Sequence, residues 1–318
     1  MNTTVILKTE HLYKKYGSLQ AVHDLSLEIY EGEVFGFLGP NGAGKTTSIN
    51  MMCGLLKPDS GTVTIHGKPV TNHDSTTRSR VGVCPQEIVL WERLTCLEQL
   101  IFIGQMYGIP TTIAHQRSER LLEELDLVEK RNKQARTLSG GMQRRLNLAM
   151  ALVHDPEIVV LDEPEAGLDP QSRVKVREYI HSLARRRTVI LTTHDMDEAE
   201  RLADRVAIID HGSLLVLDTP QELKKRAGSG DILEISLRST PSEPLSQLIQ
   251  AMLSTLPGEP RFTCSGNQIT LRVLDGANVL PSVLSILTNL QVGVEDIHLR
   301  ANSLEDVFIH LTGRRLRE

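Results

Sequence analysis

Residues 39–46 read Gly-Pro-Asn-Gly-Ala-Gly-Lys-Thr, and this stretch decides the fold of the chain. It fits the pattern of a glycine, four residues and then Gly-Lys-Thr, which is typical of a loop that surrounds phosphate groups. An apolar run at 34–38 leads into the loop, and residues 45–53 have a helical pattern that ends at Gly54. The sequence therefore predicts the strand, loop and helix arrangement that such a loop requires.

Two further segments follow the loop along the chain. Residues 138–142 read Leu-Ser-Gly-Gly-Met and open an amphipathic helix, and residues 158–164 read Ile-Val-Val-Leu-Asp-Glu-Pro, a buried-strand run that ends in two carboxylates. Together with the glycine loop, these segments resemble the motifs of the ATP-binding cassette (ABC) superfamily. The resemblance implies an α/β fold of the P-loop NTPase type, with a mixed sheet, an antiparallel β subdomain and a helical subdomain.

Length, composition and charge limit the class of protein. At 318 residues the chain is long enough for one large domain and a smaller one. Its 35 Lys and Arg residues against 40 Asp and Glu give a net charge of −5, which does not favour nucleic acid as a partner. No apolar run approaches the ~20 residues of a membrane-spanning helix, and the first residues lack the pattern of a secretory signal. The four cysteines have no metal-ligand spacing, and we expect free thiols in a cytoplasmic protein.

Changes in the sequence pattern predict two domains, of which the cassette is expected to span 1–226. Strand-like segments at 5–7, 26–29 and 61–65 predict its antiparallel β subdomain. A helical pattern then predicts a helical subdomain at about 95–153. Strands and helices alternate through the remainder of the cassette, which predicts a mostly parallel sheet.

A glycine-rich break at 226–231 separates the cassette from a smaller domain expected at 231–318. Its apolar patterns predict the order strand, helix, strand, strand, helix, strand, which is typical of a small α+β ferredoxin-like unit. The Pro-Gly pair at 257–258 is expected to end its first helix. A last helix is expected to begin at Ser303, whose spacing to Asp306 resembles a capping box.

The resemblance implies that ATP and Mg²⁺ bind at the glycine loop. Glycines let backbone N–H groups approach the phosphates, and Lys45 would place its ammonium on the β and γ phosphates. Tyr16 matches the aromatic residue that stacks on adenine in relatives, with Tyr13 as a nearby competitor. The residues expected to contact ATP are Tyr16, Gly39, Pro40, Asn41, Gly42, Ala43, Gly44, Lys45, Thr46, Thr47, Ser139, Gly140 and Gly141.

Four residues are expected to take part in hydrolysis. Glu163 would orient the attacking water as general base, and His194 resembles the switch histidine of the family, which supports that glutamate. Gln86 matches the glutamine loop of the family, and Lys45 would stabilise the phosphates. The expected Mg²⁺ ligands are Thr46, Gln86 and, through water, Asp162.

The resemblance also implies that one chain cannot complete an ATP site alone. Ser139–Gly141 would contact the γ phosphate held by an opposite cassette, so a head-to-tail homodimer, or another paired cassette, would enclose two ATP molecules. Residues 166–169 resemble the loop that crosses this interface. Two positions depart from the family pattern: Met142 replaces the usual glutamine, and Glu165 stands beside the interface where Thr, Ser or an aromatic residue is more common.

Segments outside the ATP motifs favour a transporter subunit. Residues 91–100 and 106–110 resemble the segment that docks a coupling helix of a membrane subunit. Residues 304–314 are similar to the tail of bacterial drug-resistance subunits of the daunorubicin-exporter type. The resemblance implies an ATP-hydrolysing exporter subunit at the cytoplasmic face of the inner membrane, with a polytopic permease on a separate chain as its partner. The alternatives are a soluble regulatory ATPase that acts on the ribosome or DNA, and a nucleotide-binding regulator with little turnover.

Overall fold

The computed structural model describes residues 4–71, 79–184, 186–226, 230–253, 261–273 and 276–313. The chain divides into two compact units, Met1–Pro220 and Gln221–Leu316. Parts of three predicted features lie outside the described residues, namely 227–229 of the glycine-rich break, the helix end at 257–258 and residue 314 of the closing run.

The second unit begins at Gln221, within helix α8 (Pro220–Arg226), so the division falls earlier than the predicted cassette end at 226. Leu223 of α8 is fully buried. The Asn302 side chain donates a hydrogen bond to the Lys224 carbonyl at 2.8 Å. This hydrogen bond ties α8 to a residue of the C-terminal unit far along the chain, which no local pattern within α8 could reveal.

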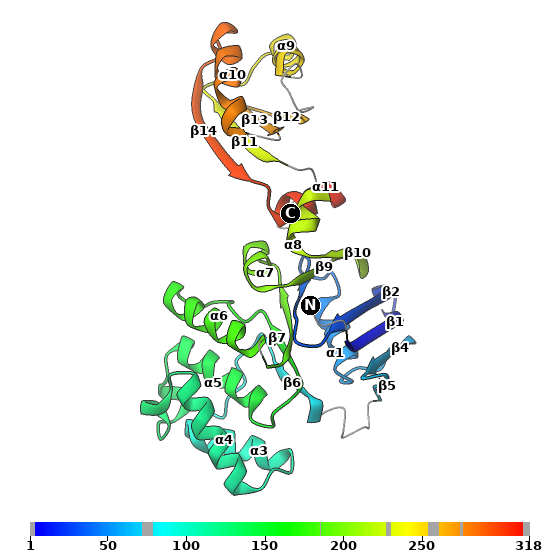
Figure 1. Ribbon diagram of the computed structural model, residues 1–318, viewed down its shortest axis with the longest axis vertical. Helices are drawn as coiled ribbons and strands as arrows, with labels where there is room; N and C mark the ends of the chain where they lie inside the picture. The colour runs from blue at the N-terminus through cyan, green and yellow to red at the C-terminus, as the bar shows by residue number, and fades with distance from the viewer. Residues whose placement is uncertain are drawn as a thin grey trace. The chain divides into compact units, whose positions relative to one another are not determined.

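A six-stranded sheet in the order β10-β9-β3-β8-β7-β6 forms the centre of the first unit (Figure 1). Its strands are β3 (Val34–Leu38), β6 (Val81–Cys84), β7 (Ile158–Asp162), β8 (Thr188–Thr193), β9 (Arg205–Asp210) and β10 (Ser213–Asp218). The strands from β6 to β9 pair in parallel, and β10 joins antiparallel. Every residue of β3 is buried, because helices and a second sheet cover both of its faces. The predicted mostly parallel sheet is confirmed.

An antiparallel sheet in the order β2-β1-β4-β5 forms the predicted β subdomain. Its strands are β1 (Val5–Tyr16), β2 (Leu19–Tyr30), β4 (Ser60–Ile65) and β5 (Lys68–Pro69). Phe35 of β3 and Met52 of helix α1 (Lys45–Met52) are buried in one core with Leu12 and Ile29 of this sheet. The two sheets therefore enclose the helix that follows the glycine loop.

The helical subdomain gathers at the end of the first unit away from the antiparallel strands (Figure 1). It contains α3 (Cys96–Met106), α4 (Thr111–Glu124), the short 3₁₀ turns η1 (Val128–Lys130) and η2 (Ala135–Thr137), and α5 (Gly140–Leu152). Thr95 and Glu98 form a capping box that begins α3. Two further helices, α6 (Pro170–Ala184) and α7 (Met196–Leu202), connect the central strands. The predicted helical insert is confirmed.

The second unit contains a four-stranded antiparallel sheet in the order β12-β13-β11-β14. Its elements are β11 (Asp231–Leu237), α9 (Glu243–Leu253), β12 (Arg261–Ser265), β13 (Gln268–Val273), α10 (Gly276–Asn289) and β14 (Val294–Ala301). Leu233 and Ile235 alternate along β11 and pack in one core with Ile249 of α9 and Val283 of α10. The predicted element order is confirmed, and the ferredoxin-like assignment stays a prediction that this sheet order supports.

A partly buried ion pair joins the end of β14 to the closing helix α11 (Leu304–Thr312). Ser303 and Asp306 form the predicted capping box. Arg300 donates to both oxygens of Asp306, at 2.7 and 3.0 Å, and also to Glu234 of β11 at 2.8 Å. Burial opposes ionisation of Asp306, but the hydrogen bonds from Arg300 and Ser303 outweigh it and lower the pKa of this carboxyl.

We predict that Asp306→Ala destabilises the second unit by about 2 kcal/mol, because it removes one half of the capping box and deprives the Arg300 guanidinium of its buried carboxylate partner. Amide hydrogen exchange of β11 and α10 measures this effect, which corresponds to an increase in the exchange rate of about thirtyfold. Asp296→Ala is the matched control, because its ion pair with His298 is exposed and contributes little. Equal protection factors in the two variants would contradict the prediction.

Candidate functional site

The glycine loop joins the end of β3 to α1, as the sequence predicts. Gly44 begins the helix with φ of 97°, a left-handed conformation that side chains rarely adopt. A Cβ atom at Gly44 would lie 2.2 Å from the Ala21 carbonyl oxygen, and one at Gly39 would lie 2.4 Å from the Ile209 carbonyl oxygen. These two positions therefore accept only glycine, and the chain packs tightly behind the loop while the front of the loop stays open.

Lys45 lies inside the loop that precedes it. Its side chain is buried, and Nζ donates hydrogen bonds to the carbonyl oxygens of Gly39 at 2.6 Å and Pro40 at 3.1 Å. Burial lowers the pKa of the ammonium, while the nearby carboxylates Glu163 and Asp162 act in the opposite direction. The loop therefore holds a positive charge beside the backbone N–H groups.

A cavity of about 260 Å³ opens in front of the loop. It is lined by Tyr16, Leu19, Ala21, Pro40, Asn41, Gly42, Gly44, Lys45, Thr46, Thr47, Gln86, Asp162 and Glu163. Most of the predicted ATP, Mg²⁺ and hydrolysis residues therefore share one cavity. Tyr16 lines it with a half-exposed ring, whereas Tyr13 packs edge-on against His23 and does not contribute to the lining.

Glu163 connects two predicted site residues at the edge of this cavity. Its carboxylate accepts a hydrogen bond from Gln86 Nε2 at 3.0 Å, and its other oxygen lies 2.7 Å from His194 Nδ1. The side chain is buried, and the backbone is in the left-handed region with φ of 47°. Its N–H donates to the Thr192 carbonyl of the neighbouring strand at 3.0 Å. This strained turn is held by the sheet and directs the carboxylate into the cavity.

The residues at the cavity fit a magnesium ion. Thr46, Gln86 and Asp162 all line it, and each offers an oxygen, which is the ligand type that Mg²⁺ prefers. Asp162 also accepts a short hydrogen bond from Thr192 Oγ1, which orients its carboxylate. The described residues contain no cluster of three or more His, Cys, Asp and Glu side chains suited to a metal. A site with one carboxylate agrees with a cation that completes its shell with water and phosphate oxygens.

The predicted signature residues do not line this cavity. Ser139 and Gly140 are exposed at the start of α5, where Ser139 Oγ accepts a hydrogen bond from the Met142 N–H at 3.3 Å. A Cβ atom at Gly141 would lie 2.2 Å from Ser172 Oγ, which itself donates to Asp169 at 2.6 Å. The signature therefore packs on the start of α6 and leaves its first two residues accessible to another molecule.

The carboxylate of Glu165 is buried and paired within the chain. It accepts two hydrogen bonds from the Arg177 guanidinium of α6, at 2.9 and 2.7 Å, and its side chain is only 8% exposed. The expected charge beside the interface is therefore neutralised within the chain. Sequence reasoning missed Arg177, because its link to Glu165 depends on how the loop folds back on α6.

A second buried carboxylate, Glu198 of α7, lies close behind the site. Burial raises its pKa to about 8, the hydrogen bond from Thr193 opposes this shift, and the charges of Glu165, Asp195 and Glu163 add to it. Thr193 Oγ1 donates to Glu198 Oε2 at 2.5 Å, whereas the buried Oε1 has no partner among the described residues. The structure therefore favours a neutral carboxyl at this position near neutral pH.

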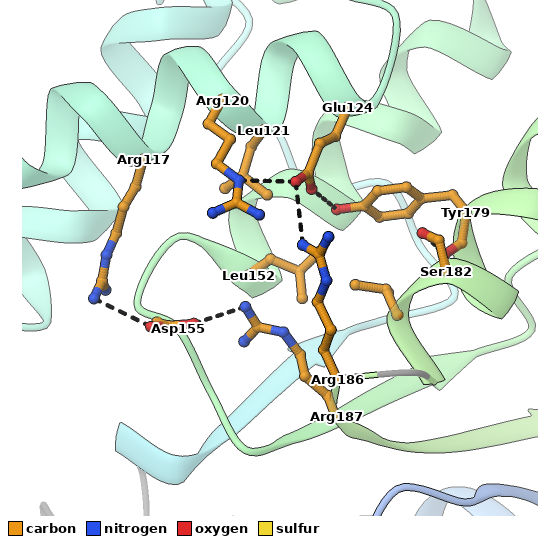
Figure 2. A pocket seen from close by; sticks show the side chains of 11 residues that line it. Arg117, Arg120, Leu121, Glu124, Leu152, Asp155, Tyr179, Ser182, Arg186 and Arg187 are labelled. Carbon is orange, nitrogen blue, oxygen red and sulfur yellow. Dashed lines mark hydrogen bonds and ion pairs between the residues drawn. The ribbon is translucent and has the colours of Figure 1, made fainter.

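A second cavity, of about 330 Å³, lies between α4 and α6 and holds none of the predicted site residues (Figure 2). Figure 2 shows its two carboxylates shared between four arginines: Glu124 pairs with Arg120 and Arg186, and Asp155 pairs with Arg117 and Arg187. The Tyr179 hydroxyl also donates to Glu124 at 3.3 Å. These ion pairs tie the helical subdomain to the central sheet and account for the charges in this cavity.

Large apolar side chains are exposed along residues 88–113, which include the predicted docking segment. They are Ile88, Val89, Trp91, Phe102, Met106, Tyr107 and Ile113. The rings of Trp91 and Phe102 pack edge to face with their centroids 5.2 Å apart, so part of this surface is ordered without being buried. An apolar surface of this kind is typical of an interface with another protein.

The glycine loop at the end of a parallel strand, the carboxylate-ended neighbouring strand and the cavity between them define a nucleotide-binding ATPase of the P-loop class. The family described as "ABC transporter" matches residues 22–166, which contain the loop, the signature and both carboxylates.

Known proteins resemble the chain over nearly its whole length. It is 38% identical to the "Nod factor export ATP-binding protein I" of Ralstonia nicotianae (strain ATCC BAA-1114 / GMI1000), over 100% of this chain and 97% of that protein. It is 36% identical to the "Daunorubicin resistance ATP-binding protein DrrA2" of Streptomyces coeruleorubidus, over 97% of this chain and 95% of that protein. A solved structure of cbiO1 from Clostridium perfringens, part of the ABC transporter complex cbiONQ, matches 69% of this chain and 90% of its own, with a TM-score of 0.65 and 28% identity.

The chain therefore belongs to the ABC transporter family, as an ATP-binding subunit of the exporter type that hydrolyses ATP to power transport. The predicted resemblance to drug-resistance subunits is confirmed. The relatives support the exporter over an ATPase that acts on the ribosome or DNA.

We predict that Glu198→Gln removes a pH dependence of stability. The folded pKa of about 8 lies above the ordinary value of 4.5, so the contribution of the Glu198 carboxyl to stability is fully present below pH 4.5 and is lost as the pH rises through 8. Relative to wild type, the variant should therefore gain of order 3 kcal/mol between pH 5 and pH 8.

Urea unfolding at several pH values measures this difference. Glu178→Gln, on the exposed side of α6, is the control and should follow the wild type. Parallel stability curves for wild type and Glu198→Gln would show that the buried carboxyl is not neutral in the folded protein.

Proposed function

We propose that this chain is the motor of an exporter whose membrane permease is a separate polypeptide, and that it works as a head-to-tail homodimer at the cytoplasmic face of the inner membrane. One observation carries the proposal. The loop, Gln86, Asp162 and Glu163 share a cavity, whereas the signature residues Ser139 and Gly140 are exposed outside it. The exposed signature of one chain is therefore free to complete the ATP site of a second cassette.

Binding uses the loop and the charge that it holds. Backbone N–H groups at 42–47 and the Lys45 ammonium meet the phosphates, and Lys45 exchanges its contacts with the Gly39 and Pro40 carbonyls for phosphate oxygens. Tyr16 offers a ring face for the base. When bound, Mg²⁺ neutralises charge on the phosphate oxygens, and Thr46, Gln86 and Asp162 are the side chains that would hold it.

Hydrolysis relies on the position of Glu163. Its carboxylate orients the attacking water and accepts its proton, and the bonds to Gln86 and His194 keep it at the cavity edge. His194 is half exposed, so it can reach toward the phosphate side while contacting Glu163. The exposed N–H groups at the start of α5 bind the γ phosphate of the opposite cassette. Two cassettes close around ATP and then separate, and this movement is transmitted to the membrane permease.

The apolar surface at 88–113 is the proposed docking site for the permease. It begins just after Gln86, so the same segment reaches from the ATP cavity to an exposed apolar face. In the described parts of the chain, no helix has both the length and the apolar character that a membrane crossing requires. A separate permease would supply the crossing and the choice of cargo.

We predict that Glu163→Gln retains ATP affinity and lowers the ATP turnover rate by at least about a hundredfold, because the shape is kept while the base is lost. ATP should then hold the variant as a dimer. Phosphate release measures turnover, and light scattering with and without ATP measures the dimer. Unchanged turnover would rule out Glu163 as the base. Unchanged turnover is also the result expected if the chain is a nucleotide-binding regulator with little turnover.

We further predict that Glu163→Gln protein, isolated from its native membranes in detergent with ATP, retains a polytopic membrane protein. The replacement of Trp91 and Phe102 by Ser, on the docking surface, should abolish this association. The same replacement in a chain that keeps Glu163 should leave the ATP turnover of the isolated chain unchanged. Mass spectrometry identifies the partner. Association with ribosomal or DNA-bound proteins alone would contradict the exporter proposal.

A further inference from the structure

Arg144 of α5 is the largest side chain in the fully buried interior, with 1% of its surface exposed. Its guanidinium donates five hydrogen bonds, all to backbone carbonyl oxygens: Pro164 at 3.1 Å, Pro85 at 2.7 Å, Gln86 at 2.9 Å, Asp162 at 2.8 Å and Glu163 at 2.6 Å. A guanidinium has five N–H groups, so each donor has a partner. The buried charge is therefore stabilised by carbonyl dipoles, and no carboxylate of the described residues forms an ion pair with it.

The five carbonyls belong to the two loops that carry the hydrolysis residues. Pro85 and Gln86 follow β6, and residues 162–164 end β7 and begin the turn after it. The guanidinium is a rigid plane and donates hydrogen bonds to both loops, so it fixes the distance between them. The Gln86 side chain can then meet the Glu163 carboxylate at 3.0 Å.

The backbone at Glu163 explains why these carbonyls converge. Its positive φ of 47° turns the chain at the end of the strand, and the carbonyls on either side of this turn bond to one arginine. A left-handed conformation at a residue other than glycine persists only where the surroundings hold it. Arg144 is buried and does not line the cavity, and it supplies that restraint from inside the protein.

Arg144 also lies one helical turn from the signature. It follows Gly140 by four residues and Gly141 by three, so these positions share one face of α5. A displacement of the two loops therefore moves the start of α5 as well. The signature serves the opposite cassette, whereas the loops serve the chain's own ATP.

We propose that Arg144 is a positioning residue that couples the two ATP sites of the dimer. It holds Gln86 and Glu163 in register for hydrolysis in its own site, and it links their position to the signature that the same chain presents to the other site. This inference rests on the proposed homodimer. Arg144 touches no nucleotide itself and acts through the loops that it bonds.

The next residue along the helix offers a matched control. Arg145 is also buried, but it points away from the ATP site and donates to the carbonyls of Leu125 at 2.5 Å and Asp126 at 3.2 Å, at the end of α4. A substitution there disturbs a buried arginine of the same helix without touching either catalytic loop.

The test compares Arg144→Lys and Arg144→Gln with Arg145→Lys. Lysine keeps the charge but donates from a single atom, and glutamine keeps two N–H donors without a buried charge, so at least one variant is expected to fold. Turnover, KM for ATP, affinity for a fluorescent ATP analogue and melting temperature are measured for each. We expect both Arg144 variants to lose at least about tenfold in kcat, with analogue affinity within about threefold of wild type.

Arg145→Lys separates positioning from general stability. It should lower the melting temperature by an amount similar to Arg144→Lys and retain kcat within about twofold of wild type. In the Glu163→Gln background, Arg144→Lys should also require at least about tenfold more protein to form the ATP-held dimer, whereas Arg145→Lys should not.

Two results would overturn the inference: wild-type kcat in both Arg144 variants, or equal losses of kcat in the Arg144 and Arg145 variants at equal melting temperature.

Failure of the homodimer proposal is recognised independently, in the wild type. Its specific activity should rise with protein concentration, because each site needs a second chain. A constant specific activity down to a demonstrated monomer would exclude coupling between two sites, whereas a kcat loss confined to Arg144 variants would still assign the positioning role within one site.

Discussion

The structure depends on the alignment of parallel strands that end at one edge of the central sheet. Because β3, β6, β7 and β8 run in the same direction, the loops that follow them meet at this edge. The glycine loop, Gln86, Glu163 and His194 come from four separate segments, yet they surround or border one cavity. The tight packing behind Gly39 and Gly44 holds the loop against the sheet and keeps its open side toward the cavity.

Buried ionisable side chains set the positions of the functional groups around that edge. Arg144 is surrounded by carbonyl dipoles, Glu165 is paired with Arg177, and Glu198 is held by Thr193 with a raised pKa. Each of these groups loses hydration on burial and needs a specific partner in return. This requirement restricts the loops to a small number of arrangements, which is what a hydrolysis site with fixed geometry needs.

Local patterns predicted much of the fold. Helix α1 begins at Lys45 as its sequence indicates, and the capping box at Ser303 begins α11 as expected, because such signals act over three or four residues. The order of strands and helices in both units could also be predicted from the sequence. The attachment of α8 to the C-terminal unit could not be predicted in this way, because the Lys224 carbonyl accepts a hydrogen bond from Asn302, many positions away. The burial of Arg144 could not be predicted either, because its neighbours in the sequence indicate only a helix.

The amino-acid sequence by itself determined the class of the protein, the order of its elements and the residue types at the ATP site, because ordered motifs and apolar periodicity are local properties. Only the tertiary structure decided which groups meet. It brought Gln86 to Glu163, paired Glu165 with Arg177, separated the signature from the cavity of its own chain and joined two loops to one guanidinium. The physical reason is that a buried polar group is satisfied by whatever partner the packed chain brings within hydrogen-bond distance, and sequence separation does not limit that choice.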